Sequence, residues 1–440
     1  MKPDICFINI FYNQLQQFKP DRRRFVYMLI RISSILFLLC IPVHAADWAT
    51  WLGPNRDGKS RETGLLTSWP EGGPRIAWKA TGLGEGYSTM AIVGDRIYTL
   101  GQQGEQQFVL ALDTTAGKQV WKTSVGKAFH SDQGGGPRSM PQVDGNRLYA
   151  LAADGTLACL DTETGSQVWG FNYIEKFGSP MPEWAFCESP LIDGDRLIIA
   201  PEGNGTAIVA LNKATGDVIW QSGDAEAGYS SVLGFDFDGH RIYTVLTNSV
   251  AIGVDAKDGS LLWRYERVVN NFANVVTPVY SDGYVFYSSA YGTGSALLRL
   301  EVEKGKVKAT EAYFTSSMQN DYATSIKIGD YLYGFSGYEV GILTAMEFKT
   351  GKVFWKDRRA EKGNCILADR LMYCQGDEGT VTLIDPSQDG YKEMARFTIT
   401  RPETHMPYVY GGNMWAVPAI ANGRLYIRDL DNLYAYDIKR

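Results

Sequence analysis

The sequence predicts an all-β protein, an eight-bladed β-propeller of four-stranded antiparallel blades. Three observations lead to this fold class: a hairpin motif recurs eight times, turn glycines recur about every 45 residues, and no segment shows sustained helical periodicity. Each period has room for four short strands, which is the sequence signature of a propeller blade. Two unrelated β-sandwiches would not explain equal periods with matching turns.

Each repeat opens with a hairpin of the form apolar-x-(Asp/Asn)-Gly-x-Arg-(Leu/Ile)-Tyr. Asp-Gly and Asn-Gly supply the positive φ angles of a tight turn, and the β-branched and aromatic residues that follow alternate as strand residues do. The copies lie at 93–98, 144–149, 193–198, 238–243, 282–287, 328–333, 368–373 and 422–427.

A second strand pair completes each repeat. In "LACLDTETG" (157–165), apolar residues alternate before a Thr-Gly turn, and other repeats show the same pattern. Four residues after the turn glycine comes a Trp in five repeats, whereas Ala309 and Met394 take that place in two weaker ones. We expect these Trp residues to pack between neighbouring blades; they are Trp121, Trp169, Trp220, Trp263 and Trp355.

The last repeat is incomplete at the C-terminus. From Val417 to Arg440 it has three strands and lacks the outer strand with its Trp. The stretch "GPRIAWKATG" (73–82) has the character of that missing strand. A ring closed by an N-terminal strand in its last blade leaves no open ends. We therefore predict a propeller over residues 75–440, preceded by a leader segment over 47–74.

Residues 1–46 have the features of an export signal. "RRR" (22–24) precedes an apolar run over 25–43 and a small-residue cleavage site near Ala45 or Ala46. Translation from Met28 would give a compact signal. A membrane anchor is the rival interpretation, and Leu39 before Cys40 disfavours lipidation. We predict a periplasmic or secreted protein with no stable membrane span after cleavage.

The net charge limits the kinds of partner that the protein can bind, and the cysteines bear on its redox state. The first 46 residues hold six Lys and Arg against two Asp, so the net charge of −6 becomes −10 without them. An acidic body argues against nucleic acid as a partner. We expect a monomer.

Four cysteines lie after residue 46, at a spacing that fits no zinc site. We expect mostly buried free thiols with room for one disulfide; Cys365 and Cys374 flank a turn but are not directly opposed in the register we infer.

At these repeats, and most clearly in "DGNRLYALAADGTLACLDTETGSQVW" (144–169), the chain resembles the PQQ-like β-propeller repeat family of the quinoprotein alcohol dehydrogenase-like superfamily. The leader "DWATWLGPNRDG" (47–58) is similar to the start of exported members. The resemblance implies the fold for residues 47–440. Known members include dehydrogenases that use pyrroloquinoline quinone (PQQ) and calcium, and BamB, a non-enzymatic lipoprotein of outer-membrane protein assembly.

The dehydrogenase chemistry of that family needs groups that this chain lacks or scatters. Its enzymes resemble one another in a pair of adjacent cysteines, and this chain has no Cys-Cys pair. No G-x-S-x-G, H-E-x-x-H or P-loop motif occurs. We therefore expect no catalytic residue and no metal ligand. If a calcium ion were bound, its candidate oxygen donors would be Glu188, Asn270, Asn271, Asn320 and Asp321. Asp321 would then also be the candidate base.

Irregular segments between one blade's outer strand and the next blade's inner strand should ring one mouth of the central channel. They are rich in aromatic, amide and charged residues, which suits a peptide or a polar ligand. We expect the ligand-binding residues to be Arg138, Trp184, Glu188, Tyr229, Asn271, Asn274, Asp321, His405 and Trp415.

The sequence thus predicts an exported propeller that binds a protein or a small polar ligand without catalysis. One alternative is a PQQ-dependent dehydrogenase that oxidises alcohols or sugar-like substrates. The other is a BamB-like factor of outer-membrane protein assembly.

Overall fold

The computed structural model describes residues 47–440 except 204, 224, 226–227 and 402–412. The described residues belong to one compact unit, Ala45–Arg440. The predicted export signal over 1–46 and the predicted ligand residue His405 lie outside the described residues.

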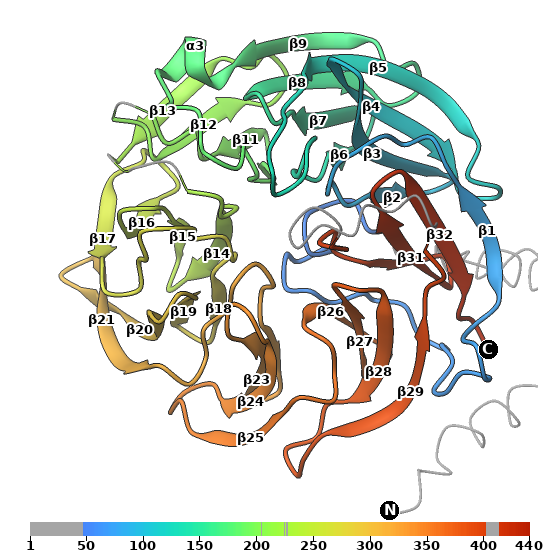
Figure 1. Cartoon of the computed structure of the whole chain (residues 1–440). Coiled ribbons are helices and arrows are strands. Elements are labelled where there is room, and N and C mark those ends of the chain that lie inside the picture. The colour runs from blue at the N-terminus through green and yellow to red at the C-terminus, as the bar shows by residue number, and fades with distance from the viewer. Residues whose placement is uncertain (1–46, 204, 224, 226–227, 402–412) are drawn as a thin grey trace, which may run out of the picture. The chain divides into compact units, whose positions relative to one another are not determined.

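Eight four-stranded antiparallel sheets form the blades of a ring, which confirms the predicted fold class (Figure 1). Strands run from the innermost to the outermost in chain order. The first four blades are β2 (Ala91–Val93), β3 (Arg96–Gln103), β4 (Gln106–Asp113), β5 (Gln119–Lys127); β6 (Gln142–Asp144), β7 (Arg147–Leu151), β8 (Thr156–Asp161), β9 (Gln167–Asn172); β10 (Leu191–Asp193), β11 (Arg196–Ile199), β12 (Ile208–Asn212), β13 (Val218–Ser222); and β14 (Leu233–Phe237), β15 (His240–Leu246), β16 (Ala251–Asp255), β17 (Leu261–Tyr265).

The remaining blades complete the ring. They are β18 (Val279–Ser281), β19 (Tyr284–Ser289), β20 (Gly294–Glu303), β21 (Lys306–Thr315); β22 (Ile326–Ile328), β23 (Tyr331–Ser336), β24 (Ile342–Glu347), β25 (Val353–Asp357); β26 (Gly363–Ala368), β27 (Leu371–Gly376), β28 (Thr380–Asp385), β29 (Lys392–Thr398); and β30 (Ala419–Ala421), β31 (Arg424–Asp429), β32 (Asn432–Asp437) with β1 (Ile76–Ala80). The single α-helix among the described residues is α3 (Tyr173–Phe177), and it is neither long nor apolar enough to cross a membrane.

The last blade closes as predicted. β1 pairs antiparallel with β32, and Trp78 lies opposite Ala435. The Asp437 amide donates to the Arg75 carbonyl at 2.8 Å, which extends the pairing by one residue. The N-terminal strand and the C-terminus therefore share one sheet, and the ring has no open blade.

A Trp from each well-formed outer strand docks on the next blade, which confirms the predicted packing role. The Trp78 ring lies over the turn glycine of the first blade, Gly117, and donates from Nε1 to the Thr114 carbonyl at 2.9 Å. Gly117 has a φ of 68°, and a Cβ there would stand 2.6 Å from the Trp78 ring. The glycine is needed both for the turn and for the space that the preceding blade's Trp fills.

In two blades the residue at the docking position differs from the one that the spacing from the turn glycine predicts. Each Trp follows a bulge in its outer strand, and counting from that bulge puts Tyr313, not Ala309, in the fifth blade's docking position. Tyr313 donates to the Phe348 carbonyl at 2.9 Å. In the seventh blade the position belongs to Ala395 rather than Met394. The fifth blade's longer β20–β21 hairpin moves its turn glycine away from the bulge, so the fixed count of four fails.

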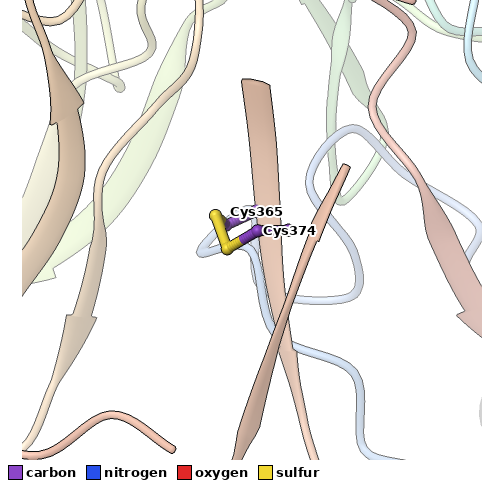
Figure 2. The surroundings of a disulfide bond; sticks show 2 residues. All are labelled: Cys365 and Cys374. Carbon is purple, nitrogen blue, oxygen red and sulfur yellow. A yellow bond between two sulfur atoms is a disulfide. The ribbon is translucent and has the colours of Figure 1, made fainter. Parts of the chain in front are cut away.

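The expected arrangement of Cys365 and Cys374 is wrong. Asp369 and Arg370 alone form the turn between β26 and β27, with φ values of 43° and 71°, so Ala368 pairs with Leu371. This register sets Cys365 directly opposite Cys374, with Cα atoms 4.1 Å apart, and the two form a disulfide (Figure 2). The sequence indicated a turn between the two cysteines, but without a glycine it did not mark the two central residues that set the register. Cys159 and Cys187 are free thiols.

The leader enters the central channel, which the sequence did not reveal. Trp48 pairs with Ile92 of β2, and the Ser60 amide donates to the Leu367 carbonyl of β26 at 2.8 Å. Between them, Trp51 Nε1 donates to Thr277 Oγ1 at 2.9 Å, beside β18. These contacts reach the inner strands of the first and seventh blades and the segment just before the inner strand of the fifth blade. The blue segment inside the ring in Figure 1 is this leader.

Candidate functional site

The described connections that carry predicted binding residues emerge on one face of the ring, here called the loop face. Two sets of segments form it: the connections from an outer strand to the next inner strand, and the turns between the second and third strands of a blade. Because strands alternate in direction, both sets emerge at the same end of every blade.

Arg138 and Trp415 meet through a residue that we had not singled out, Tyr87. The Tyr87 ring lies 4.9 Å from the Trp415 ring and 5.4 Å from the Arg138 guanidinium carbon. Arg138 also donates to the carbonyls of Gly136 and Gly134, at 2.9 and 2.7 Å. The guanidinium is therefore fixed by its own loop, and it also lies 5.3 Å from the centre of the Phe129 ring.

Asp321 belongs to a neighbouring cluster around Lys362. Lys362 Nζ lies 2.6 Å from Asp321 Oδ2, and 4.9 and 5.7 Å from the ring centres of Tyr322 and Tyr338. Burial raises the pKa of Asp321, and the nearby Lys362 opposes that shift. Since the Asp321 side chain is only 11% exposed and already paired, it is a poor general base.

The two clusters join into one series of aromatic and cationic side chains along the loop face. Tyr322 lies 6.0 Å from Trp415, and beyond Lys362 the Tyr338 ring lies 4.5 Å from Tyr291. Tyr291 in turn stacks on Phe272 at 5.1 Å. We call this the aromatic series; its members are Phe272, Tyr291, Tyr338, Lys362, Tyr322, Trp415, Tyr87 and Arg138.

One end of the aromatic series is open to solvent. Phe272 is 62% exposed, Tyr338 is 41% exposed, and neighbouring Val340 is 59% exposed. Exposed aromatic and aliphatic side chains gathered in this way are typical of protein-binding surfaces. The sequence carried a signal for them, since Tyr338 and Val340 interrupt the turn "SGYEVG" (336–341), but we weighed only the longer connections between blades.

Trp184 and Tyr229 form a separate pair on the loop face. Their rings lie 5.6 Å apart, and the Tyr229 amide donates to the Asn274 carbonyl at 3.1 Å. Asn274 is fully buried, and its side chain bonds to Asn270 and Asn248. Asn271 is exposed to solvent. Asn274 therefore braces the loop that presents Asn271 and Phe272.

Glu188 lies inside the channel wall rather than on the surface. It is 3% exposed, and Oε1 accepts hydrogen bonds from the Tyr173 hydroxyl at 2.8 Å and the Ala200 amide at 3.0 Å. Burial raises the pKa of Glu188 to about 7, against the opposing effects of these bonds and of Arg56. Glu188 is therefore part of the scaffold beneath the loop face.

The residues considered as calcium donors do not fit a shared ion. The Asn270 side-chain oxygen accepts from the amides of Phe272 and Ala273, at 2.7 and 2.8 Å. Asn320 bonds to Phe335 and Ser325. Within the described part of the chain, no three His, Cys, Asp or Glu side chains group closely enough to hold a metal. Without adjacent cysteines either, these residues do not fit a PQQ–calcium centre.

Comparison with known proteins gives the family. The sequence profile described as outer membrane protein assembly factor BamB matches residues 67–175 and 181–357. The chain belongs to this family. Among curated members, BamB of Shewanella oneidensis is 22% identical over 321 residues, 69% of this chain and 78% of its own length. BamB of Yersinia pestis is 22% identical over 316 residues, 67% of this chain and 76% of its own length.

Solved structures share the fold. BamB from Moraxella catarrhalis aligns with a TM-score of 0.54 at 17% identity, over 80% of this chain and 94% of its own. Quinohemoprotein alcohol dehydrogenase from Comamonas testosteroni aligns with a TM-score of 0.58 at 12% identity, over 89% of this chain and 80% of its own. At such identities these likenesses concern architecture alone.

Proposed function

We propose that this chain is a non-catalytic, protein-binding propeller of the cell envelope that takes part in outer-membrane protein assembly. The observation that carries the proposal is the aromatic series, with its exposed end at Phe272, Tyr338 and Val340. Rigid aromatic side chains provide large contact areas at low entropic cost, which suits a binding surface for polypeptide.

The state of the charged groups supports binding over catalysis. The Tyr322 hydroxyl donates to Asp377, and burial raises the pKa of Asp377 to about 7. Asp321 is held by Lys362. Asp321 and Asp377 are therefore committed to neighbours within the protein, whereas the exposed end of the aromatic series offers apolar area at Phe272, Tyr338 and Val340. A face of this kind can hold a partner by burial of apolar area.

Membership of the BamB family supports the assembly role, because its curated members carry the name of outer membrane protein assembly factor. With the predicted export signal, this favours a periplasmic location and partners among envelope proteins. We propose a monomer that uses the loop face for those partners.

A capture experiment with matched variants tests the proposal. The tagged chain is mixed with detergent-solubilised outer membranes, and bound proteins are identified by mass spectrometry. We expect outer-membrane β-barrel proteins or their assembly partners to be enriched. The loop-face variant Phe272→Ser/Tyr338→Ser/Val340→Ser should lower that enrichment more than about tenfold. The control Val120→Ser/Val168→Ser/Val218→Ser changes similarly exposed residues on outer strands and should leave it unchanged. Equal capture by both variants, or no barrel protein at all, would contradict the role.

A quinone titration tests the dehydrogenase alternative. PQQ and calcium are added to the purified chain, and the quinone absorbance and dye reduction with alcohols are followed. We expect neither saturable binding nor turnover. Stoichiometric binding with turnover would replace the proposal by a dehydrogenase acting on alcohols or sugar-like substrates.

A further inference from the structure

A cavity of about 390 Å³ lies in the channel, between the leader and the inner strands β14, β18 and β22. It is here called the lumen cavity. It extends to Ser281 and Gly329, which are at the hairpin ends of these strands. The aromatic series belongs to the opposite ends of the blades, so the lumen cavity is a separate site. Its volume is within the range of small-molecule pockets in proteins.

One wall of the lumen cavity is flat and apolar. Phe235 and Tyr280 line it, with ring centres 3.9 Å apart and planes inclined by 11°. Leu233 and Val279 extend the same wall. Stacked rings beside aliphatic side chains form a surface that a planar hydrocarbon or aromatic group can cover.

The opposite wall, from the leader, holds buried polar atoms without partners. Arg56 is only 6% exposed, and its two Nη atoms donate to the carbonyls of Ser189 and Pro190, at 2.7 and 2.9 Å. Its Nε has no hydrogen-bond partner among the described residues, and neither has the buried Oδ1 of Asp57. Leaving a buried donor such as Arg56 Nε unpaired is costly, which indicates an acceptor bound there, whereas the Asp57 oxygen calls for a donor.

The lining carries an excess of positive charge. Arg56, Lys59 and Lys327 contribute cations, and Asp57, 3.1 Å from Lys59, contributes an anion. Lys327 lies 3.9 Å from Asp282 and donates to the Gly329 carbonyl at 2.7 Å. Burial lowers the pKa of Arg56 to about 9, so the guanidinium stays charged at neutral pH. A ligand that enters beside these groups is favoured if it is anionic.

We propose that the lumen cavity binds a small aromatic acid, with its ring on the Phe235–Tyr280 wall and its acid group toward Arg56 and the two lysines. The site depends on the leader, which supplies Arg56, Asp57 and Lys59. It is a ligand site beyond the protein-binding face proposed above.

Two fluorescent probes that differ in charge test the proposal on the full exported chain. The first is 8-anilinonaphthalene-1-sulfonate, an aromatic anion, and the second is its uncharged analogue N-phenyl-1-naphthylamine. We expect one equivalent of the anion per chain and an affinity at least about tenfold higher than that of the neutral analogue. Lys59→Gln/Lys327→Gln should weaken anion binding about tenfold. Ser281→Phe, which fills the cavity from one side, should abolish it.

Control variants separate this site from other surfaces. Lys306→Gln/Lys349→Gln removes two cations outside the cavity and should leave the affinity unchanged. Phe272→Ser/Val340→Ser on the loop face should also leave it unchanged. The proposal is overturned if the anion does not bind, if the neutral probe binds equally well, or if the loop-face variant alone removes binding.

Discussion

Trp78→Ala tests how the ring is closed. Trp78 is the docking residue of β1, the N-terminal strand that completes the last blade. It is 9% exposed, its ring centre lies 5.9 Å from that of Tyr426, and Nε1 donates to the Thr114 carbonyl. The substitution therefore removes the main contact between the closing strand and the first blade, while the strand pairing itself remains.

The size of the effect follows from burial. Truncating a buried Trp to Ala in a protein core destabilises by about 3–5 kcal/mol. The Thr114 carbonyl keeps a hydrogen bond from Arg424, so the lost indole bond adds little. We expect a loss of about 3–4 kcal/mol in the free energy of unfolding. The total free energy of unfolding of a native protein is roughly 5–15 kcal/mol, so a loss of this size should be easy to measure.

Chemical denaturation and hydrogen exchange are the assays. Trp121→Ala is the matched control, because Trp121 makes the same kind of bond, to the Thr162 carbonyl at 3.0 Å, within the continuous chain. Both variants should lose stability, but only Trp78→Ala should expose the amides of β1 and β32 to exchange through a local opening. A loss below about 1 kcal/mol, or unchanged protection of β32, would refute the closure argument.

Three further predictions concern buried groups. Burial raises the pKa of Glu188 from 4.5 to about 7. Between these two pH values the folded chain holds a proton that the unfolded chain releases. The free energy of unfolding therefore falls as the pH rises from about 4.5 to 7. Glu188→Gln should reduce that slope by up to about 1.4 kcal/mol per pH unit in denaturant titrations, and an unchanged slope would contradict this. The Cys365–Cys374 disulfide closes a sequence separation of 9 residues, so its reduction should cost about 2.5 kcal/mol in wild type and nothing in Cys365→Ser/Cys374→Ser. Arg428 is 1% exposed and donates to the Ser88 and Gly84 carbonyls, at 2.9 and 3.2 Å. Arg428→Met should therefore lower stability by about 3 kcal/mol or more, and an unchanged denaturation midpoint would contradict that role.

The blades could be predicted from the sequence because their signals are local. Asp-Gly turns, alternating strands and a docking Trp each lie within one repeat, and the partner strand "GPRIAWKATG" (73–82) was recognised from the same local pattern. The predicted docking residue was wrong where we counted a fixed number of residues from the turn glycine. Tyr313 takes the docking position because a bulge, not the turn glycine, sets it. Cys365 faces Cys374 because Asp369 and Arg370 form a tight turn without glycine.

The site was harder to predict because its residues come together across blades. Arg138 and Trp415 were selected from separate connections, and the Tyr87 ring that joins them is far from both in the sequence. Glu188 was selected as a polar loop residue, but it points into the channel wall. The path of the leader through the channel depends on contacts with several inner strands, which no local pattern reports.

The most direct test of the proposed function is crosslinking from single positions on the two surfaces. A photoreactive amino acid is placed at Tyr338 on the loop face, or at Val120 on an outer strand, which have similar exposed fractions of 41% and 45%. After irradiation of intact cells, crosslinked proteins are identified by mass spectrometry. We predict crosslinks from position 338 to an outer-membrane β-barrel protein or an assembly partner, and none to these from position 120. Equal yields from both positions, or no such crosslink from position 338, would contradict a binding role for the loop face.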